Sequence, residues 1–177
     1  VELALKYDVD ILWIGARTVV SPFSVQTIAD ALAGVNIPIM VKNPVNPDIK
    51  LWIGAIERFN AIGINKLIAI HRGFHYFEKS PFRNAPMWEI PIELKRILPQ
   101  LPIIVDPSHI CGNRELIESI SQKALDLEMD GLMIESHLDP DNAYTDIAQQ
   151  ITPANLQILL DKLVIRRKKG DIDFQHK

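Results

Sequence analysis

The chain has 177 residues, of which 47% are hydrophobic and 23% charged, and its formal net charge is −3 at pH 7. This composition is typical of a globular domain and excludes disordered, collagen-like and coiled-coil chains. The small negative charge gives no general attraction for nucleic acid, and no apolar run approaches the roughly 18 residues of a membrane span. The single cysteine, Cys111, cannot form an intrachain disulfide and suits a reducing compartment. We therefore expect a soluble, cytoplasmic protein that binds small molecules, and neither nucleic acid nor membrane.

The chain opens on VELALKYDVD, without an initiator Met and without a visible secretory signal. This segment has the pattern of the end of a helix. We therefore expect further chain before Val1 in the natural protein.

Five short runs rich in Val, Ile and Leu recur along the chain, at residues 10–14, 38–42, 67–71, 102–106 and 131–135. Each is nearly continuous in apolar character, as in strands of a parallel sheet that is covered on both faces. Amphipathic patterns between and after them predict helices over 47–60, 113–128, 141–150 and 153–163. For the first of these, Asn46 before Pro47 is the expected start signal and Gly63 the stop signal.

Polar side chains follow every predicted strand at its carboxyl end: Arg17, Lys42, His71 with Arg72, Asp106 with His109, and Glu135 with His137. A TIM barrel collects its active site from many strand ends, whereas an open doubly wound sheet concentrates ligands at one switch point. The pattern therefore predicts an α/β fold, a TIM (β/α)8 barrel. A complete barrel needs about 250 residues, so we expect only the last five βα units here, with the N-terminal strands missing. The predicted boundaries are a partial barrel over 1–164 and a tail or linker over 165–177.

Three of these strand ends carry cations that would meet at one mouth. Arg17 follows Gly15-Ala16, Lys42 ends an apolar strand, and Arg72 follows His71. Guanidinium and ammonium groups placed in this way suit the phosphate and carboxylate groups of a substrate with several negative charges. The alternative is a set of ordinary surface cations.

A second group has the chemistry of a metal site. His109, Glu135 and Asp146 offer an imidazole and two carboxylates from neighbouring loops, a ligand set suited to a divalent transition ion. Their spacing is not a compact metal motif, so a structural, hydrogen-bonded histidine is the alternative interpretation.

Several segments together resemble one enzyme family: DILWIGART, PIMVKNPVN, IHRGF, LPIIVDPSHICGNREL and DGLMIESHLDPDNAYTDIAQQ. Over about residues 1 to 163, the chain resembles 3-deoxy-D-arabino-heptulosonate 7-phosphate (DAHP) synthase. The most similar branch has a barrel like that of 3-deoxy-octulosonate 8-phosphate synthase and is fused in some bacteria to a chorismate mutase domain.

The resemblance implies a divalent metal cofactor, Mn²⁺ or a similar ion, bound by a Cys, a His, a Glu and an Asp. The last three match His109, Glu135 and Asp146. The family's metal Cys lies on a strand upstream of Val1, as does its KPRTS-type substrate loop. Cys111 is not that cysteine, and we interpret it as a small packed thiol.

The same resemblance implies that Arg17, Lys42 and Arg72 bind phosphoenolpyruvate, and that Lys42, Arg72 and His109 are catalytic. The implied reaction is the condensation of phosphoenolpyruvate with erythrose 4-phosphate, with release of phosphate, at the entry to aromatic amino-acid synthesis. Because the family's metal Cys and KPRTS-type loop would lie upstream, we expect these 177 residues to be inactive by themselves. A homo-oligomer and a mutase domain beyond the C-terminus are the implied partners.

Three alternatives remain open. The sister enzyme, 3-deoxy-octulosonate 8-phosphate synthase, uses arabinose 5-phosphate, but its loops usually read KKGQF where this chain has VKNPVN, and D-x-THS where it has DPSHICG. A non-catalytic barrel remnant that binds a phosphorylated ligand or a partner would expose strand edges and tend to associate. A different metal-dependent lyase or aldolase on the same barrel would act without phosphoenolpyruvate.

Overall fold

A computed structural model describes residues 1–166 of the chain. Its centre is a five-stranded parallel sheet in the order β1-β2-β3-β4-β5, so each strand pairs with the next one along the chain. The strands are β1 (Leu12–Ile14), β2 (Ile39–Lys42), β3 (Leu67–His71), β4 (Ile103–Val105) and β5 (Gly131–Leu132). The prediction of a parallel sheet from five apolar runs is confirmed, although β5 is the shortest strand.

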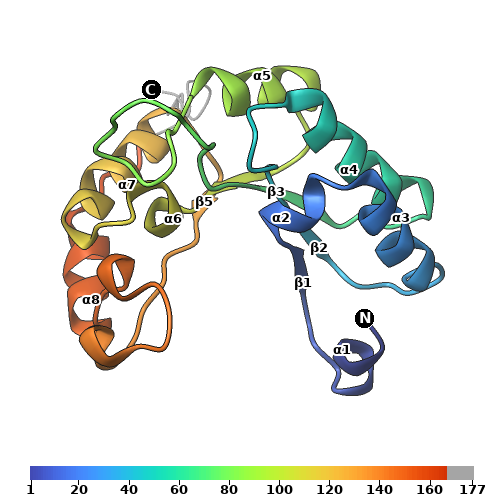
Figure 1. The fold of residues 1–177 in the computed structure, drawn as a ribbon, viewed down its shortest axis with the longest axis horizontal. Helices are drawn as coiled ribbons and strands as arrows, with labels where there is room; N and C mark the ends of the chain where they lie inside the picture. The colour runs from blue at the N-terminus through green and yellow to red at the C-terminus, as the bar shows by residue number, and fades with distance from the viewer. Residues whose placement is uncertain (167–177) are drawn as a thin grey trace, which may run out of the picture.

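The α-helices are α1 (Glu2–Lys6), α2 (Ala16–Val19), α3 (Pro22–Ala31), α4 (Ile49–Ala61), α5 (Glu89–Ile97), α6 (Pro107–Cys111), α7 (Ile117–Asp126) and α8 (Pro153–Lys162). Most of them lie along the outer side of a curved sheet and form an open arc, whereas α1 lies apart from the arc, before β1 (Figure 1). Residues 1–166 also contain three short 3₁₀ helices, η1 (Arg114–Leu116), η2 (Pro140–Asn142) and η3 (Ile147–Gln149). Sequential right-handed βα units of this kind bring the carboxyl ends of all strands to one rim.

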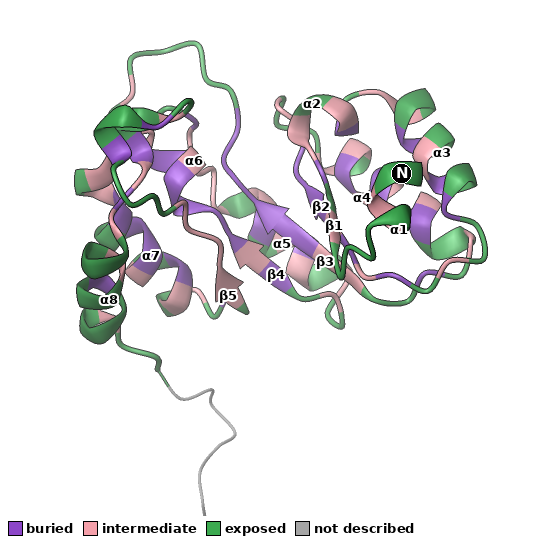
Figure 2. Cartoon of the chain, turned by 90° about the horizontal axis from the view of Figure 1, so that it is seen from below, coloured by how far each residue is buried: buried purple, intermediate pink, exposed green. Residues whose placement is uncertain are grey.

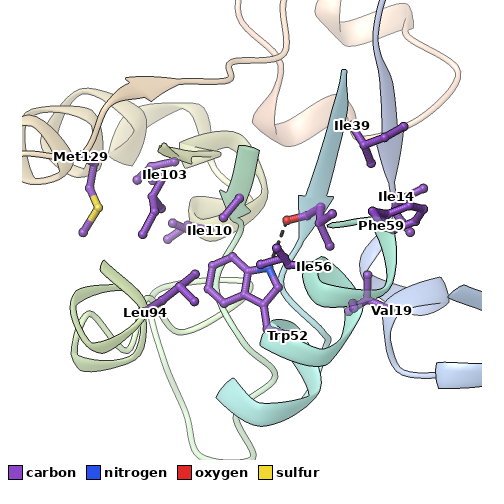
Figure 3. Packing of buried hydrophobic residues seen from close by; sticks show 14 of the residues in the cluster. Ile14, Val19, Ile39, Trp52, Ile56, Phe59, Leu94, Ile103, Ile110 and Met129 are labelled. Atoms are coloured by element: carbon purple, nitrogen blue, oxygen red, sulfur yellow. Dashed lines mark hydrogen bonds between the residues drawn. The ribbon is translucent and has the colours of Figure 1, made fainter. Parts of the chain in front are cut away.

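The hydrophobic core fills the space between the sheet and these helices. Ile14, Val41, Ala69 and Ile103 form one register row across four strands, and all belong to the buried cluster. Trp52 of α4 is fully buried, and its indole Nε1–H donates to the Val41 carbonyl oxygen at 3.1 Å (Figure 3). Burial is concentrated in the central strands and in the helix sides that face them (Figure 2).

Alternate residues of the strands face the concave side. Trp13, Met40 and Ile68 form one row of this face, and Trp13 is 61% exposed. Lys42 lies on the same face, at the carboxyl end of β2, beside Ile70 of β3. The concave face therefore directs Lys42 toward the rim where the other polar strand ends lie.

Local signals explain where the helices begin and end. Asp48 caps α4 by accepting from the Leu51 N–H at 2.9 Å, so the expected start signal at Asn46 is wrong by two residues. Gly63 follows α4 with φ +90°, as its role as a stop signal requires. Thr152 caps α8 in the same way, and the helix predicted over 153–163 is present.

The prediction of one helix over residues 141–150 is wrong. This stretch forms η2 and η3 separated by irregular chain, and Asp146 precedes η3 with a positive φ of 55°. The predicted tail lies outside the described residues from residue 167 onward. Among the described helices, none combines the length and apolar character needed to cross a membrane.

Candidate active site with a metal-binding group

A polar cavity of about 520 Å³ lies at the carboxyl ends of the strands. Side chains from four consecutive strand ends and from the loop after β5 line it, among them Arg17, Lys42, Arg72, Arg83, His109 and Asp146. The structure therefore brings together the three cations and two of the three metal-ligand candidates that the sequence singled out. In open α/β folds and barrels, this end of the sheet is where ligands bind.

Asp106 is the buried centre of this site. It follows β4, is 1% exposed, and uses Oδ2 to contact both Lys42 Nζ at 3.1 Å and His109 Nδ1 at 2.8 Å. Its Oδ1 accepts from the His109 backbone N–H at 3.0 Å, as the cap of α6. The Asp106 carboxylate thus contacts both Lys42, a candidate substrate ligand, and His109, a candidate metal ligand.

The charge of Asp106 is maintained by these contacts. Burial by itself would raise the pKa of Asp106, but the hydrogen bond with His109 and the charges of His109 and Lys42 together hold that pKa below its usual value. Asp106 Oδ2 lies 2.8 Å from His109 Nδ1 and so places a negative charge beside the imidazole.

His109, Glu135 and Asp146 form the group that could hold an ion, because ligand atoms of all three lie within 4.8 Å of one another. Divalent ions bind nitrogen and oxygen at roughly 2.0–2.6 Å, so two ligands of one ion lie at most about 5 Å apart. One imidazole and two carboxylates also match the ligand preferences of Mn²⁺-like ions. The residues present therefore fit a divalent metal.

Arg72 is held in place by two asparagines. Its guanidinium NH1 donates to Asn84 Oδ1 at 2.7 Å, and its backbone N–H donates to Asn43 Oδ1 at 2.7 Å. Asn84 Nδ2 in turn donates to the His109 carbonyl oxygen at 2.7 Å. Burial lowers the pKa of Arg72, and the nearby charge of Asp106 opposes that shift. Since a guanidinium stays protonated in proteins, Arg72 is a fixed, partly desolvated cation at the cavity wall.

Gly73 makes this arrangement possible. Its φ is +76°, and a Cβ at this position would lie 2.6 Å from the Asn84 backbone oxygen. Gly73→Ala is therefore expected to displace Asn84, to weaken binding of anions at Arg72, and to destabilise the protein by about 1–3 kcal/mol. The matched control is Gly63→Ala, because Gly63 also has a positive φ of 90° but open space around it. Urea unfolding and phosphate-analogue titration of both variants measure the difference, and equal losses in the two variants would contradict the role of Asn84.

Arg17 and Arg83 complete the ring of cations. Arg17 lies in α2, exposed at the edge of the cavity, and its charge acts on the pKa of Arg72. Arg83 was not predicted from the sequence. Its NH1 donates to Asp146 Oδ1 at 2.5 Å and to Gln149 Oε1 at 2.7 Å. The hydrogen bond from Arg83 lowers the pKa of Asp146, which keeps this candidate ligand ionised.

His71 does not reach the cavity, although the sequence placed it beside Arg72 at the strand end. It faces the helices, is 0% exposed, and its ring lies against Trp52, Phe74 and Trp88 at centroid distances of 6.5, 5.7 and 5.3 Å. Burial lowers the pKa of His71 to about 3, and the charge of Arg72 acts in the same direction. His71 is therefore a neutral core residue.

The burial of His71 predicts that the folded protein loses stability at acid pH. Between pH 6.5 and about 3 the unfolded chain binds a proton at His71 that the folded chain does not, so stability falls as pH falls through this range. The expected slope from this residue is about 1.4 kcal/mol per pH unit once the pH is well below 6.5. Urea unfolding of wild type and His71→Phe at pH 7.5, 6.0 and 5.0 tests it. The variant should lose less stability on acidification, and parallel losses would contradict the assignment.

Further polar residues at this rim were not predicted from the sequence. Asn43 directly follows Lys42, and its position after a strand was a usable signal. Arg83 and Asn84 lie in the irregular segment between β3 and α5, where no periodicity marks them. Gln149 is 1% exposed and donates from Nε2 to Glu135 Oε2 at 2.8 Å.

Cys111 lies apart from the metal-ligand group. It is 2% exposed and belongs to the hydrophobic cluster under α6. Burial raises the pKa of the Cys111 thiol to about 12, and the charge of Asp106 adds to the shift. Because the thiolate is the metal-binding form, Cys111 is a packed thiol and not a ligand.

Comparison with known proteins agrees with this geometry. The DAHP synthetase I family matches residues 3–168. A phospho-2-dehydro-3-deoxyheptonate aldolase of Thermotoga maritima is 31% identical over 142 residues, which are 80% of this chain and 40% of that protein. A 2-dehydro-3-deoxyphosphooctonate aldolase of Bartonella bacilliformis is 28% identical over 130 residues, 67% of this chain and 38% of that protein.

Solved structures give the same result. A truncated form of 3-deoxy-D-arabino-heptulosonate 7-phosphate synthase from Thermotoga maritima superposes with a TM-score of 0.75 at 28% identity, covering 89% of this chain and 58% of that one. The chain thus spans less than two thirds of the length of these relatives. Its five βα units form part of a TIM barrel, as predicted, and the chain belongs to the DAHP synthetase I family.

Proposed function

We propose that this protein catalyses the DAHP synthase reaction, the metal-dependent condensation of phosphoenolpyruvate with erythrose 4-phosphate. The observation that carries the proposal is one cavity whose wall presents Arg17, Lys42 and Arg72 beside His109 and Asp146. Cations for an anionic enol donor and ligands for a divalent ion are the two requirements of this chemistry. Family membership supports the same reaction.

The cations would bind the phosphate and carboxylate of phosphoenolpyruvate. Lys42 and Arg72 are nearly buried, at 9% and 8% exposure, so their charges act through a poorly hydrated environment. Arg72 can present a planar guanidinium for bidentate binding, and Lys42 a point charge. Arg17, at the exposed edge, would contact the anion as it enters.

Asp106 connects the metal-ligand group to this anion site, because it contacts both His109 and Lys42. A divalent ion bound by His109, Glu135 and Asp146 would supply Lewis-acid polarisation of the aldehyde oxygen of the second substrate. The contribution of the chain is to hold these ligands. Asp106 fixes the ring of His109, while the Ser108 hydroxyl accepts from the Glu135 backbone N–H at 2.9 Å and fixes the start of that loop. Mn²⁺ is the ion we propose for this ligand set.

The second candidate acceptor is arabinose 5-phosphate, because proteins named 2-dehydro-3-deoxyphosphooctonate aldolase also match this chain. The VKNPVN and DPSHICG segments favour the four-carbon sugar. We also keep as predictions a cytoplasmic location, a homo-oligomer and a chorismate mutase domain in the natural protein. Size-exclusion chromatography with light scattering tests the oligomer.

The function is tested by release of inorganic phosphate from phosphoenolpyruvate in the presence of Mn²⁺. We expect the full-length protein to release phosphate with erythrose 4-phosphate, to release little with arabinose 5-phosphate, and to release none after treatment with a chelator. Preference for arabinose 5-phosphate would favour the sister reaction. Release that does not need phosphoenolpyruvate as donor would overturn the proposal in favour of another lyase. Phosphoenolpyruvate binding without turnover with either sugar would favour a ligand-binding remnant.

A further inference from the structure

Two carboxylates of the metal-ligand group are joined by a continuous chain of hydrogen bonds. Gln149 Nε2 donates to Glu135 Oε2 at 2.8 Å, and Gln149 Oε1 accepts from Arg83 NH1 at 2.7 Å. The same NH1 donates to Asp146 Oδ1 at 2.5 Å. One glutamine and one arginine thus connect Glu135 to Asp146.

The amide of Gln149 has only one productive orientation in this chain. It is 1% exposed, so both of its polar ends need partners within the protein. A carboxylate accepts only and a guanidinium donates only, so the NH₂ group must face Glu135 and the carbonyl oxygen must face Arg83. Such an amide can hold a negative and a positive group apart at a fixed distance.

The backbone around Gln149 is fixed relative to Glu135. The Ile151 N–H donates to the Glu135 carbonyl oxygen at 3.2 Å, and the His137 N–H donates to the Ile151 carbonyl oxygen at 3.0 Å. The Gln149 N–H donates to the Asp146 carbonyl oxygen at 3.1 Å. Backbone hydrogen bonds thus join the segment that carries Glu135 to the segment that carries Asp146 and Gln149.

Arg83 lies close to Gly112, at the end of α6. A Cβ on Gly112 would lie 2.5 Å from the Arg83 Cβ, and the Arg83 N–H donates to the Cys111 carbonyl oxygen at 3.2 Å. The loop after β3 is thereby fastened to the end of α6, the helix that carries His109. Arg83 thus contacts both Asp146 and the helix that carries His109.

We propose that Gln149 is a positioning residue for the divalent ion: it holds Glu135 directly and Asp146 through Arg83, so that each carboxylate keeps one oxygen for the metal. The oxygens left for the ion are Glu135 Oε1, which lies 3.6 Å from His109 Nδ1, and Asp146 Oδ2. Each carboxylate then binds through a single oxygen. This inference rests on the proposed function, because it assumes that the group binds a divalent ion.

The experiment compares Mn²⁺ binding by wild type, Gln149→Met and Gln150→Met, with free Mn²⁺ followed by electron paramagnetic resonance. Gln150 is the matched control, because it is the adjacent glutamine and its Nε2 donates to the Thr145 backbone carbonyl oxygen, whereas Nε2 of Gln149 donates to the side chain of Glu135. Loss of a hydrogen bond to a metal ligand typically weakens metal binding by about 10–100-fold, and we expect this loss for Gln149→Met only. The absorption spectrum of the Co²⁺-loaded protein should change in the same variant, because Glu135 is no longer restricted to one oxygen.

Thermal unfolding of each variant separates positioning from folding. Gln149→Glu is the second variant if Gln149→Met does not fold, because it retains the acceptor for Arg83 but places a carboxylate opposite Glu135. Weaker Mn²⁺ binding by a folded Gln149 variant supports the proposal, and binding as tight as in wild type, or tighter, overturns it. Failure of wild type itself to bind Mn²⁺ would count against the proposed function. If wild type bound Mn²⁺ and the Gln149 variants bound it equally tightly, only the positioning role of Gln149 would be contradicted.

Discussion

His109→Ala is expected to lower Mn²⁺ affinity by more than roughly 100-fold and to reduce phosphate release from phosphoenolpyruvate to background. His109 supplies the only imidazole of the metal-ligand group that the described residues form, and its Nδ1 is oriented by Asp106 at 2.8 Å. Removal of the ring leaves two carboxylates, a weaker site for a transition ion. Equilibrium dialysis against Mn²⁺ and the phosphate assay measure the two effects.

The fold should tolerate this change, because Asp106 retains its contact with Lys42 at 3.1 Å. His137→Ala is the matched control. His137 is also a histidine after a strand end, but it is exposed and its Nδ1 accepts from the Asp139 backbone N–H. Unchanged Mn²⁺ affinity in His109→Ala, or equal losses in the two variants, would contradict the assignment of His109 as a ligand.

Lys42→Met is expected to weaken phosphoenolpyruvate binding at least tenfold and to destabilise the protein by about 3 kcal/mol. Both effects have one cause. The side chains of Lys42 and Asp106 are 11% and 1% exposed, so removal of the ammonium leaves a buried carboxylate without its lysine partner. Isothermal titration with phosphoenolpyruvate and urea unfolding measure the two losses.

A double variant separates the two effects. Lys42→Met combined with Asp106→Asn removes both charges, and we expect it to recover most of the stability without recovering phosphoenolpyruvate binding. Lys66→Met is the control for a lysine of the same sheet, since Lys66 is exposed and precedes β3 at the opposite end of the strands. If Lys42→Met bound phosphoenolpyruvate as wild type does, Lys42 would be only a structural partner of Asp106.

The strand pattern was predictable because the strands of a parallel sheet in an α/β fold are apolar along nearly their whole length. The five apolar runs became the five strands, and the polar residues just beyond them met at one rim. His71 shows the limit of this reasoning. Successive residues of a strand point to opposite faces, so of the pair His71 and Arg72 only Arg72 reaches the cavity.

The residues that hold the site together were not predictable in the same way. Arg83, Asn84 and Gln149 act through hydrogen bonds between loops that lie far apart in the sequence, and no periodic pattern marks such partners. The false helix over residues 141–150 has a related cause. Its apolar spacing suited a helix, but the contacts of Asp146 with Arg83 and of Gln149 with Glu135 favour two short 3₁₀ turns instead.

The central claim is that one divalent ion and one phosphoenolpyruvate bind side by side at this rim. The most direct test is a crystal of the protein grown with Mn²⁺ and phosphoenolpyruvate, with anomalous diffraction measured above the manganese absorption edge. We expect an anomalous peak between His109, Glu135 and Asp146. The phosphate and carboxylate of phosphoenolpyruvate should lie against Lys42, Arg72 and Arg17. A manganese peak elsewhere, or phosphoenolpyruvate bound away from these cations, would contradict it.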